Sequence, residues 1–302
     1  MDGLTIEQAT TDDELGVLVE IRRRAHPDDV MNVENLRFNL DQSEQLAYLV
    51  ASLGGEPVGT AMVESWADLA FGHVVVVPER RRRGIGGALL AEIRERAGAF
   101  GETMLQMEVR ESEPESREFL EHRGFVQTGS EKALALDLTQ IEAPEVGPPP
   151  GVRIVTRVEE PDLLDQMYVV GVQADEDIPG SEGVPTFEEW KMHEIDRPTR
   201  RPDLCFIALA GDEVVGYAAL QVFGDLAHHG LTATRRDWRR RGVASALKRA
   251  EIAAAKRAGF RKLSTESEDR NEPMRRLNEK LGYVPEPAWS MVVMQGPVTP
   301  QG

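Results

Sequence analysis

The strongest constraint on the fold of this chain is that its sequence repeats. Residues 81–89 read RRRGIGGAL, and residues 239–247 read RRRGVASAL, 158 positions later (81 to 239). At the same offset, residues 119–125 (FLEHRGF) align with residues 277–283 (LNEKLGY). Matched blocks at one spacing indicate two copies of the same structural unit. Each copy is long enough to bury a hydrophobic core of its own.

A proline-rich segment separates the two copies. Residues 148–150 are three consecutive prolines, which cannot continue a helix or a central strand. Residues 141–151 are therefore expected to form a stiff linker. The sequence predicts an N-terminal domain over residues 1–140 and a C-terminal domain over residues 152–302.

Hydrophobic periodicity predicts mixed α/β structure in each copy. In the first copy, helices are expected to begin near Thr10–Glu14 and to cover residues 33–40, 84–100 and 113–123. Strands are expected over residues 4–8, 46–53, 58–66, 69–77, 103–109 and 132–138.

Composition limits the class of protein. The formal net charge is −17, which disfavours binding to nucleic acids or anionic membranes. The single cysteine, Cys205, lies in an apolar run and is expected to be a buried strand thiol in a reducing compartment. The N-terminal residues lack the pattern of a signal peptide, so a cytoplasmic location is expected.

The basic turns inside the repeat are candidate anion sites. In the first copy, four valines and a proline precede four arginines and the glycines Gly84, Gly86 and Gly87. This order predicts a strand, a loop and a helix N-terminus, where unpaired N–H groups attract anions. A dinucleotide fingerprint would need a third glycine at Leu89, and the Walker phosphate loop is absent. The alternative is a solvated basic turn.

These residues resemble a known family. The pattern Arg81-x-x-Gly84-x-Gly86 after a strand, and Arg239-x-x-Gly242-x-Ala244 in the second copy, are similar to the R/Q-x-x-G-x-G/A motif of the GNAT superfamily of N-acetyltransferases. The resemblance covers nearly the whole chain as two tandem domains. It implies a mixed, mostly antiparallel sheet flanked by helices in each domain, with splayed fourth and fifth strands.

The resemblance also implies acetyl-CoA as co-substrate and no metal. The turns would hold the pyrophosphate, the strand before each turn would pair with the pantetheine amides, and an N–H near Val77 would polarise the thioester. The implied coenzyme-binding residues are Val75, Val76, Val77, Arg81, Arg82, Arg83, Gly84, Ile85, Gly86, Gly87 and Ala88 in the first copy, and Thr234, Arg235, Arg239, Arg240, Arg241, Gly242, Val243, Ala244 and Asn271 in the second. The better glycine loop favours the first copy.

The implied reaction is direct transfer of acetyl to a primary amine, with a small molecule as the expected acceptor. Glu108 and Glu266 correspond on the fifth strands and are candidate general bases, with a rim carboxylate as the alternative reading. His73 and the pair at 228–229 are further candidates. The tyrosine that many members use as an acid is replaced by Leu120 and Asn278.

Two alternatives stay open at this point. The acceptor could be a protein amine, or one or both domains could bind coenzyme A without turnover. The two arginine clusters could suggest a nucleic-acid binder, but the net charge of −17 and the aromatic content of 6% disfavour it, so no nucleic-acid or membrane partner is expected. The sequence carries no indication of the oligomeric state.

Overall fold

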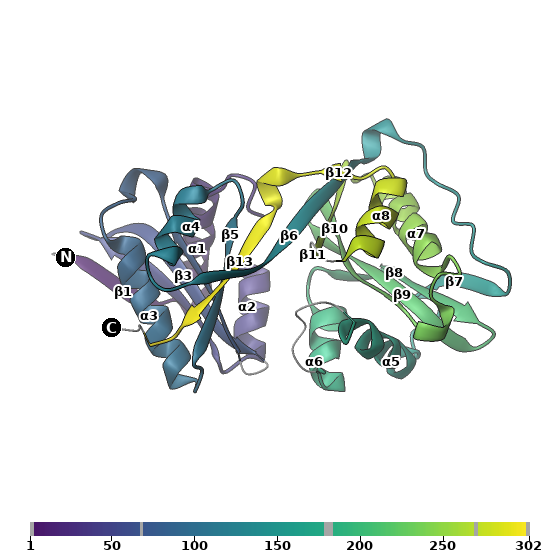
Figure 1. Ribbon diagram of the computed structural model, residues 1–302, viewed down its shortest axis with the longest axis horizontal. Helices are drawn as coiled ribbons and strands as arrows, with labels where there is room; N and C mark the ends of the chain where they lie inside the picture. Colours follow the sequence, from purple (N-terminus) through teal and green to yellow (C-terminus); the bar gives the residue numbers. More distant parts are fainter. Residues whose placement is uncertain (1–2, 67–68, 178–183, 269–270, 300–302) are drawn as a thin grey trace. The chain divides into compact units, whose positions relative to one another are not determined.

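The computed structural model describes residues 3–66, 69–177, 184–268 and 271–299. It divides into two compact units, which we describe separately. Unit 1 comprises Met1–Ser130 and Met291–Gly302, and unit 2 comprises Glu131–Ser290. Each unit has a mixed sheet flanked by helices, which confirms the α/β class predicted from the sequence (Figure 1).

The sheet of unit 1 has the order β1-β2-β3-β4-β5-β13. Its neighbouring strands pair antiparallel, except that β4 and β5 are parallel. The elements are β1 (Leu4–Gln8), α1 (Asp12–Ala25), α2 (Val33–Gln42), β2 (Leu46–Leu53), β3 (Glu56–Trp66), β4 (Leu69–Val76), the 3-10 turn η1 (Pro78–Arg80), α3 (Ile85–Ala99), β5 (Met104–Arg110), α4 (Pro114–Glu121) and β13 (Met291–Pro297).

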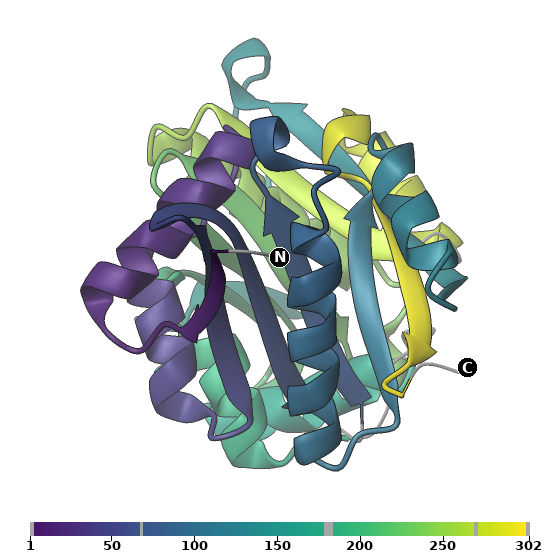
Figure 2. The ribbon, with the colours of Figure 1, turned by 90° about the vertical axis from the view of Figure 1, so that its left-hand side faces the viewer.

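Alternation along the strands explains how helices cover both faces of this sheet. On β2, Leu46 and Tyr48 pack in a cluster with α1 and α2, whereas Leu49 and Ala51 pack in the cluster that contains the buried face of α3. Successive strand side chains point to opposite faces, so one apolar strand supports both layers. Figure 2 shows α3 lying across the sheet, with β13 in yellow beside β5.

The sheet of unit 2 has the order β6-β11-β10-β9-β8-β7, with β10 and β11 parallel. The remaining neighbours that the structure describes pair antiparallel. The elements are β6 (Val126–Asp137, within this unit from Glu131), η2 (Leu138–Gln140), β7 (Val152–Thr156), α5 (Leu164–Asp175), α6 (Phe187–Lys191), the π-helical turn η3 (Met192–Asp196), β8 (Arg200–Ala210), β9 (Glu213–Phe223), β10 (Leu226–Thr234), η4 (Arg236–Trp238), α7 (Val243–Arg257), β11 (Lys262–Glu268), α8 (Glu272–Lys280), β12 (Val284–Pro285) and η5 (Pro287–Trp289).

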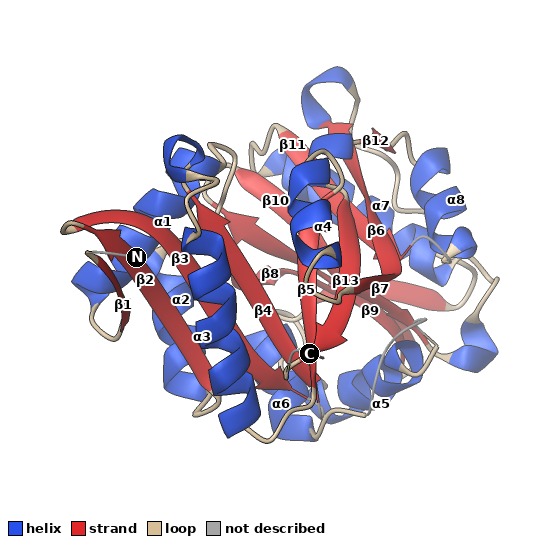
Figure 3. Cartoon of the chain, turned by 60° about the vertical axis from the view of Figure 1, so that its left-hand side comes forward, coloured by secondary structure: helices blue, strands red, loops and turns tan. Residues whose placement is uncertain are grey.

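The last strand of each repeat completes the sheet of the other unit. Residues 131–137 of β6 end the first repeat and pair with β11, whereas β13 ends the second repeat and pairs with β5 (Figure 3). The predicted domains 1–140 and 152–302, with the linker at 141–151, describe the repeat along the chain and stay a prediction. The compact units are divided elsewhere because of this exchange.

The two parallel strands in each unit pair only at one end. In unit 1, the pairs run from Ala70 with Leu105 to Gly72 with Met107, although both strands continue. In unit 2, the pairs run from Leu226 to His228 of β10. Beyond these points the fourth and fifth strands of each repeat separate, as the family resemblance implied.

A one-residue bulge distinguishes the two openings. The register of β10 on β9 shifts between His229 and Thr232, where three steps along β10 match two along β9. The corresponding pairing of β4 with β3 is regular. This extra residue explains why Gly59 and Gly216 lie 157 positions apart whereas Gly84 and Gly242 lie 158 apart.

Candidate functional site

The turn after β4 has an unusual backbone that recurs after β10. Arg82 has φ 60° and Gly84, the N-cap of α3, has φ 83°. At the equivalent positions, Arg240 has φ 59° and Gly242 has φ 94°. Over the described ranges, these two arginines are the only residues other than glycine with positive φ. A left-handed arginine is strained, so the surrounding structure must hold each turn in place.

Both turns present a run of free N–H groups. Between residues 82 and 87, and between 240 and 245, no N–H donates to another group in the described parts of the chain. The first intrahelical bonds come next, from Ala88 to Gly84 and from Ala246 to Gly242, each 3.0 Å long. Consecutive free N–H groups at the positive end of a helix dipole form a site for an anion such as pyrophosphate.

The first arginine of each motif braces the turn. The Nε atom of Arg81 donates to the carbonyl of Val76 at 3.1 Å, and that of Arg239 donates to the carbonyl of Thr234 at 3.1 Å. Both side chains therefore fold back onto the end of the preceding strand. This contact stabilises the turn, and it explains why an arginine recurs there without requiring that its side chain touch a ligand.

The arginines around the two turns differ in their ion pairs. In unit 2, Arg235 pairs with Glu213 and Asp237, and both Arg236 and Arg239 pair with Asp177. In unit 1, Arg80 pairs with Glu56 and Arg81 lies 4.0 Å from Glu113, whereas Arg82 and Arg83 form no ion pair within the described residues. Arg240 and Arg241 likewise form no ion pair within the described residues, so the turns differ in their first arginine: Arg81 lies farther from Glu113 than Arg239 lies from Asp177, at 2.6 Å.

The strand that leads to each turn has one free side. The N–H of Val77 donates to Val58 of β3 at 3.0 Å, so a thioester oxygen would have to meet the N–H of a neighbouring residue. Because successive N–H groups of a strand point to opposite neighbours, the N–H of Val76 faces the opening between β4 and β5. In unit 2, Arg235 is likewise bonded to Val215, and Thr234 faces the opening.

Side-chain burial divides the predicted coenzyme residues into two groups. Val75, Val77, Ile85 and Val243 are buried in the cores, so only their backbone could meet a ligand. The other predicted turn residues are exposed or half-buried: Val76, Arg81, Arg82, Arg83, Gly84, Gly86, Gly87, Ala88, Thr234, Arg235, Arg239, Arg240, Arg241, Gly242 and Ala244. The side chain of Asn271 caps α8 by accepting from the N–H of Met274 at 3.4 Å, so this oxygen already has a partner.

A histidine and a glutamate stand where the opening of unit 1 begins. His73 and Glu108 each follow the last pair between β4 and β5, Gly72 with Met107. Alternation places Glu108 on the same face as Arg110, which bonds to the α1–α2 loop. His73 lies on that face as well, because its ring contacts α1.

The ring of His73 is held by a charged pair from the α1 side. Its Nδ1 atom lies 3.0 Å from Nη1 of Arg22, and Arg22 forms an ion pair with Asp29 at 2.7 Å. Burial, followed by the charge of Arg22, lowers the pKa of His73 to about 3. Burial alone would raise the pKa of Asp29, but Arg22 outweighs it and the pKa is lowered. His73 is therefore a neutral ring at physiological pH.

A second set of charged residues surrounds His26, the C-cap residue of α1. The Nδ1 atom of His26 lies 3.5 Å from Glu113, and Glu113 lies 4.0 Å from Arg81 at the start of the turn. Arg110, at the end of β5, holds Asp28 at 2.9 and 3.0 Å. Burial, and then the charge of Arg110, lowers the pKa of His26, so that its free-base form is favoured. The His26 imidazole therefore lies between the turn after β4, through Glu113, and the end of β5, where Arg110 lies.

Sequence reasoning missed most of this charged cluster. Arg22, His26, Asp28, Asp29 and Arg110 come from three separate segments, and no linear motif joins them. The one indication of this cluster in the sequence was the segment 25–35, which contains one His, two Asp and two Asn residues. Only the fold shows that this loop meets the end of β5.

The corresponding region of unit 2 has a different character. Glu266 on β11 is exposed and lies opposite Ala133. His228 bonds to Ser264 at 2.9 Å, and burial lowers its pKa to about 3. Burial raises the pKa of Cys205 to about 12, in agreement with a structural thiol. Trp190 lies in a core cluster rather than in an opening.

The described residues contain no group of three or more His, Cys, Asp or Glu side chains placed to bind a metal ion. Among the helices that the structure describes, none is long and apolar enough to cross a membrane.

Comparisons with known proteins agree with the geometry of the repeat. The model of the family described as "Acetyltransferase (GNAT) family" matches residues 15–125 and 172–283. No curated protein matches this sequence.

Several solved structures share the fold over nearly the whole chain. A GCN5-related N-acetyltransferase from Sphaerobacter thermophilus is 20% identical with a TM-score of 0.78, over 100% of this chain and 98% of that one. A tandem GNAT protein from the clavulanic acid biosynthesis pathway is 22% identical with a TM-score of 0.78, over 99% and 100%. A putative acetyltransferase from Pyrococcus horikoshii is 17% identical with a TM-score of 0.62, over 100% and 91%.

Proposed function

This chain belongs to the GNAT acetyltransferase family as a tandem protein, and on that premise we propose that unit 1 transfers acetyl from acetyl-CoA to a primary amine of a small molecule. The observation that carries the proposal is the run of free N–H groups at residues 82–87, placed where β4 separates from β5. The proposed setting is cytoplasmic, and no metal takes part.

Unit 1 is the better candidate for coenzyme binding. Gly86 and Gly87 stand at the second and third positions of α3, where side chains would crowd a bound phosphate. In unit 2, Ala244 and Ser245 take these places, and the hydroxyl of Ser245 accepts from Arg249 at 2.8 Å. The ion pairs of Arg235, Arg236 and Arg239 also reduce the attraction of that turn for an anion.

The proposed reaction proceeds without a covalent enzyme intermediate. The amine nitrogen attacks the thioester carbonyl carbon, the C–S bond breaks, and its electron pair leaves with the coenzyme thiolate. We propose that the N–H of Val76 or of a nearby strand residue stabilises the developing oxyanion. A base at the opening accepts the proton of the amine. Glu108 stays a candidate for this base, and the neutral ring of His26 is a second one.

Coenzyme binding without turnover is the second candidate function. Leu120, at the position of the missing tyrosine, is 1% exposed, and Asn278 is 0% exposed. Both side chains are buried in the cores, so neither position can supply an acid to the thiolate. This observation favours a binding role unless the thiolate leaves unprotonated or takes a proton from water.

A pair of matched variants tests which turn binds coenzyme. Gly86→Asp adds a carboxylate inside the turn of unit 1, and Ala244→Asp adds one at the equivalent position of unit 2. Titration calorimetry with coenzyme A should show about tenfold weaker binding or more for Gly86→Asp, and unchanged binding for Ala244→Asp. The reverse result would place the coenzyme in unit 2.

Turnover is tested separately from binding. Release of free thiol from acetyl-CoA should rise when a primary amine of the correct class is supplied, and Gly86→Asp should lower this rate. Tight coenzyme binding without thiol release across a broad panel of small-molecule amines would favour the non-catalytic role. Release only with protein or peptide amines would move the acceptor to that class.

A further inference from the structure

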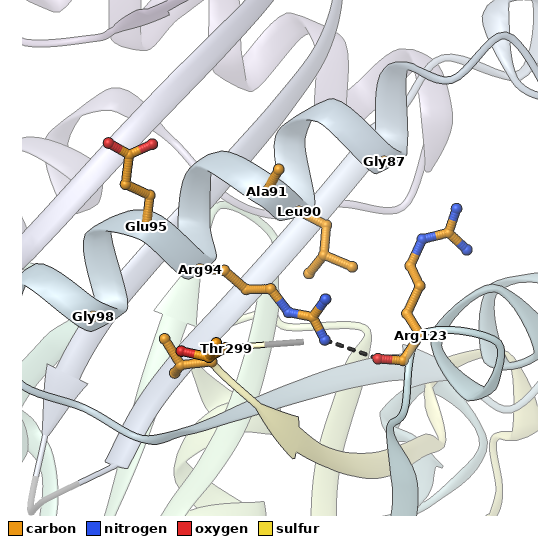
Figure 4. A pocket seen from close by; sticks show the side chains of 9 residues that line it. Gly87, Leu90, Ala91, Arg94, Glu95, Gly98, Arg123 and Thr299 are labelled. Atoms are coloured by element: carbon orange, nitrogen blue, oxygen red, sulfur yellow. Dashed lines mark hydrogen bonds between the residues drawn. The ribbon is translucent and has the colours of Figure 1, made fainter. Parts of the chain in front are cut away.

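A shallow depression runs along the outer side of α3 in unit 1. Its volume is about 410 Å³, and Figure 4 shows the side chains that line it. The lining residues are Gly87, Leu90, Ala91, Arg94, Glu95, Gly98, Arg123, Val298 and Thr299. It begins at Gly87, in the first turn of the helix, and continues to Gly98 in the fourth. The depression is therefore continuous with the proposed pyrophosphate turn.

Arg94 is a buried guanidinium in this depression without a carboxylate partner. The residue is 9% exposed, and its Nε atom has no hydrogen-bond partner in the described structure. The Nη2 atom of Arg94 donates to the carbonyl of Arg123 at 2.9 Å. The guanidinium lies 5.1 Å from the centre of the Phe125 ring. Burial, and then the charge of Arg123, lowers the pKa of Arg94. A buried cation near a second cation is unfavourable until an anion joins them.

Arg123 brings its charge to the start of the helix. Its guanidinium lies 3.8 Å from the centre of the Phe119 ring and donates to the Phe119 carbonyl at 2.8 Å. Its Nη2 atom lies 3.7 Å from the point where a side chain on Gly87 would begin. These contacts fix a planar donor group beside the free N–H groups of α3. Within the described residues, neither Arg123 nor Arg94 forms an ion pair.

Glu95 is the one acidic residue that lines the depression. Figure 4 shows its carboxylate directed away from the two guanidinium groups. It forms no ion pair with either arginine among the residues that the structure describes. The side of the depression between Arg94 and Arg123 therefore remains positive.

The fold itself does not require this pair of arginines. At the offset of 158, Arg94 corresponds to Ile252 and Arg123 corresponds to Leu281 in unit 2. Ile252 is 1% exposed and belongs to the core of unit 2, so the same helix packs well without a charge. The pair is a property of unit 1 alone, the unit in which we place the coenzyme.

We propose that Arg94 and Arg123 bind the 3′-phosphate of coenzyme A. This inference rests on the proposed function. The 3′-phosphate and the pyrophosphate are carried by the same ribose, so a pyrophosphate held at the start of α3 brings the 3′-phosphate close to the first turns of the helix. A phosphate monoester dianion neutralises both cations, and two guanidinium groups supply donors in the geometry that phosphate oxygens accept.

Dephospho-coenzyme A, which carries a hydroxyl instead of the 3′-phosphate, is the probe for this site. Titration calorimetry on the full chain should show that the wild type binds coenzyme A about tenfold or more tightly than dephospho-coenzyme A. In Arg123→Met, the affinities for coenzyme A and dephospho-coenzyme A should lie within about twofold of each other. The affinity for dephospho-coenzyme A should be the same as in the wild type. Arg123→Lys should restore part of the preference.

Two further measurements keep the inference open to refutation. Arg96→Met removes an arginine of α3 that pairs with Glu92 and does not line the depression, and it should keep the full preference. Arg94→Met should also lose the preference, with thermal unfolding recorded because Arg94 is buried. Equal weakening of both ligands by Arg123→Met would overturn the inference and leave the proposed function intact. Failure of the wild type to bind either ligand would overturn both.

Discussion

The Nδ1 atom of His229 lies 2.8 Å from a carboxylate oxygen of Glu251, and neither side chain has any exposed surface. The other ring nitrogen of His229 bonds to the hydroxyl of Tyr283. Lys248, one turn before Glu251 on α7, is 1% exposed and lies 5.9 Å from the Tyr283 ring. A polar cluster therefore fills the core of unit 2 beneath β10.

The equivalent space in unit 1 is apolar. At the offset of 158, Lys248 corresponds to Leu90, Glu251 to Ile93 and Tyr283 to Phe125, and all three unit 1 residues are buried. Pairing with the neighbouring strands places Gly72 where unit 2 has His229. The same fold thus tolerates both solutions, and the polar one makes the stability of unit 2 depend on pH.

Acid should destabilise unit 2 through His229. Burial, and then the charge of Lys248, holds the pKa of His229 well below its usual 6.5. The unfolded chain therefore binds a proton that the native ring does not, and stability is lost as the pH falls below about 6.5. The slope for one such group is about 1.4 kcal/mol per pH unit.

The measurement is urea unfolding between pH 7 and pH 5, followed by tryptophan fluorescence. His229→Gln should reduce the pH slope of the unfolding free energy by about the contribution of one group. His73→Asn is the matched variant for unit 1, because the pKa of His73 is also lowered, to about 3. Equal slopes for the wild type and His229→Gln would contradict the prediction.

Removing one of the two interacting buried residues Lys248 and Glu251 should cost more than replacing both. Burial raises the pKa of Glu251 to about 8 and lowers the pKa of Lys248 to about 8. Glu251→Ala leaves Lys248 buried without an acidic partner and is expected to lower the unfolding free energy by about 3–5 kcal/mol. The double variant Lys248→Leu/Glu251→Ile copies Leu90 and Ile93 and should recover the part of that loss that comes from Lys248, whereas the Nδ1 atom of His229 loses its partner in both variants. A double variant less stable than Glu251→Ala would refute this.

Gly59 in unit 1 and Gly216 in unit 2 lie where a helix packs closely on the sheet, and Gly216 leaves less space for a side chain. A side chain at Gly216 would begin 2.8 Å from the carbonyl of Ala233, whereas one at Gly59 would begin 3.1 Å from that of Val75. Gly216→Ala should therefore destabilise the protein by about 1–3 kcal/mol, and Gly59→Ala by less. Gly16 on α1 has nothing within 4 Å, and Gly16→Ala should be neutral or stabilising. Thermal unfolding of the three variants gives the order.

The pH dependence of transfer should identify the base of unit 1. The pKa of His26 is lowered, so its base form is already present below pH 6.5, and the acid limb of kcat/KM should lie below that value. His26→Asn should remove this limb and lower the rate, whereas Glu108→Gln should leave it in place. If Glu108→Gln alone removes the limb, the carboxylate is the base. Glu266→Gln, in unit 2, should change neither the limb nor the rate.

Much of this structure could be predicted from the sequence because the signals are local. Thr11 and Glu14 form the capping box that starts α1, and the predicted strand and helix over 46–53 and 33–40 appear as β2 and α2. The strand predicted over 132–138 is longer and begins at Val126. After the exposed Val126, residues 127–132 are polar or glycine, so they carry no apolar alternation that would reveal a strand.

The partners of the last strands could not be predicted in the same way. Val292 and Met294 are buried on β13, and Ala133 and Ala135 are buried on β6. Burial alternates along β13 and is continuous over Ala133–Leu136 of β6, and neither pattern says which sheet the strand joins. The roles of Arg94 on α3 and of Arg123 in the turn after α4 could not be predicted either, because an arginine is usually a solvated surface residue.

Because the two repeats exchange their last strands, neither repeat can be deleted without damage to the sheet of the other unit. Loss of either repeat by deletion would remove a strand from the sheet that remains, and would expose the backbone of β5 or β11 along an open edge. Such edges recruit other chains and promote aggregation. Once the two strands had changed places, selection could modify each copy separately but could no longer discard one.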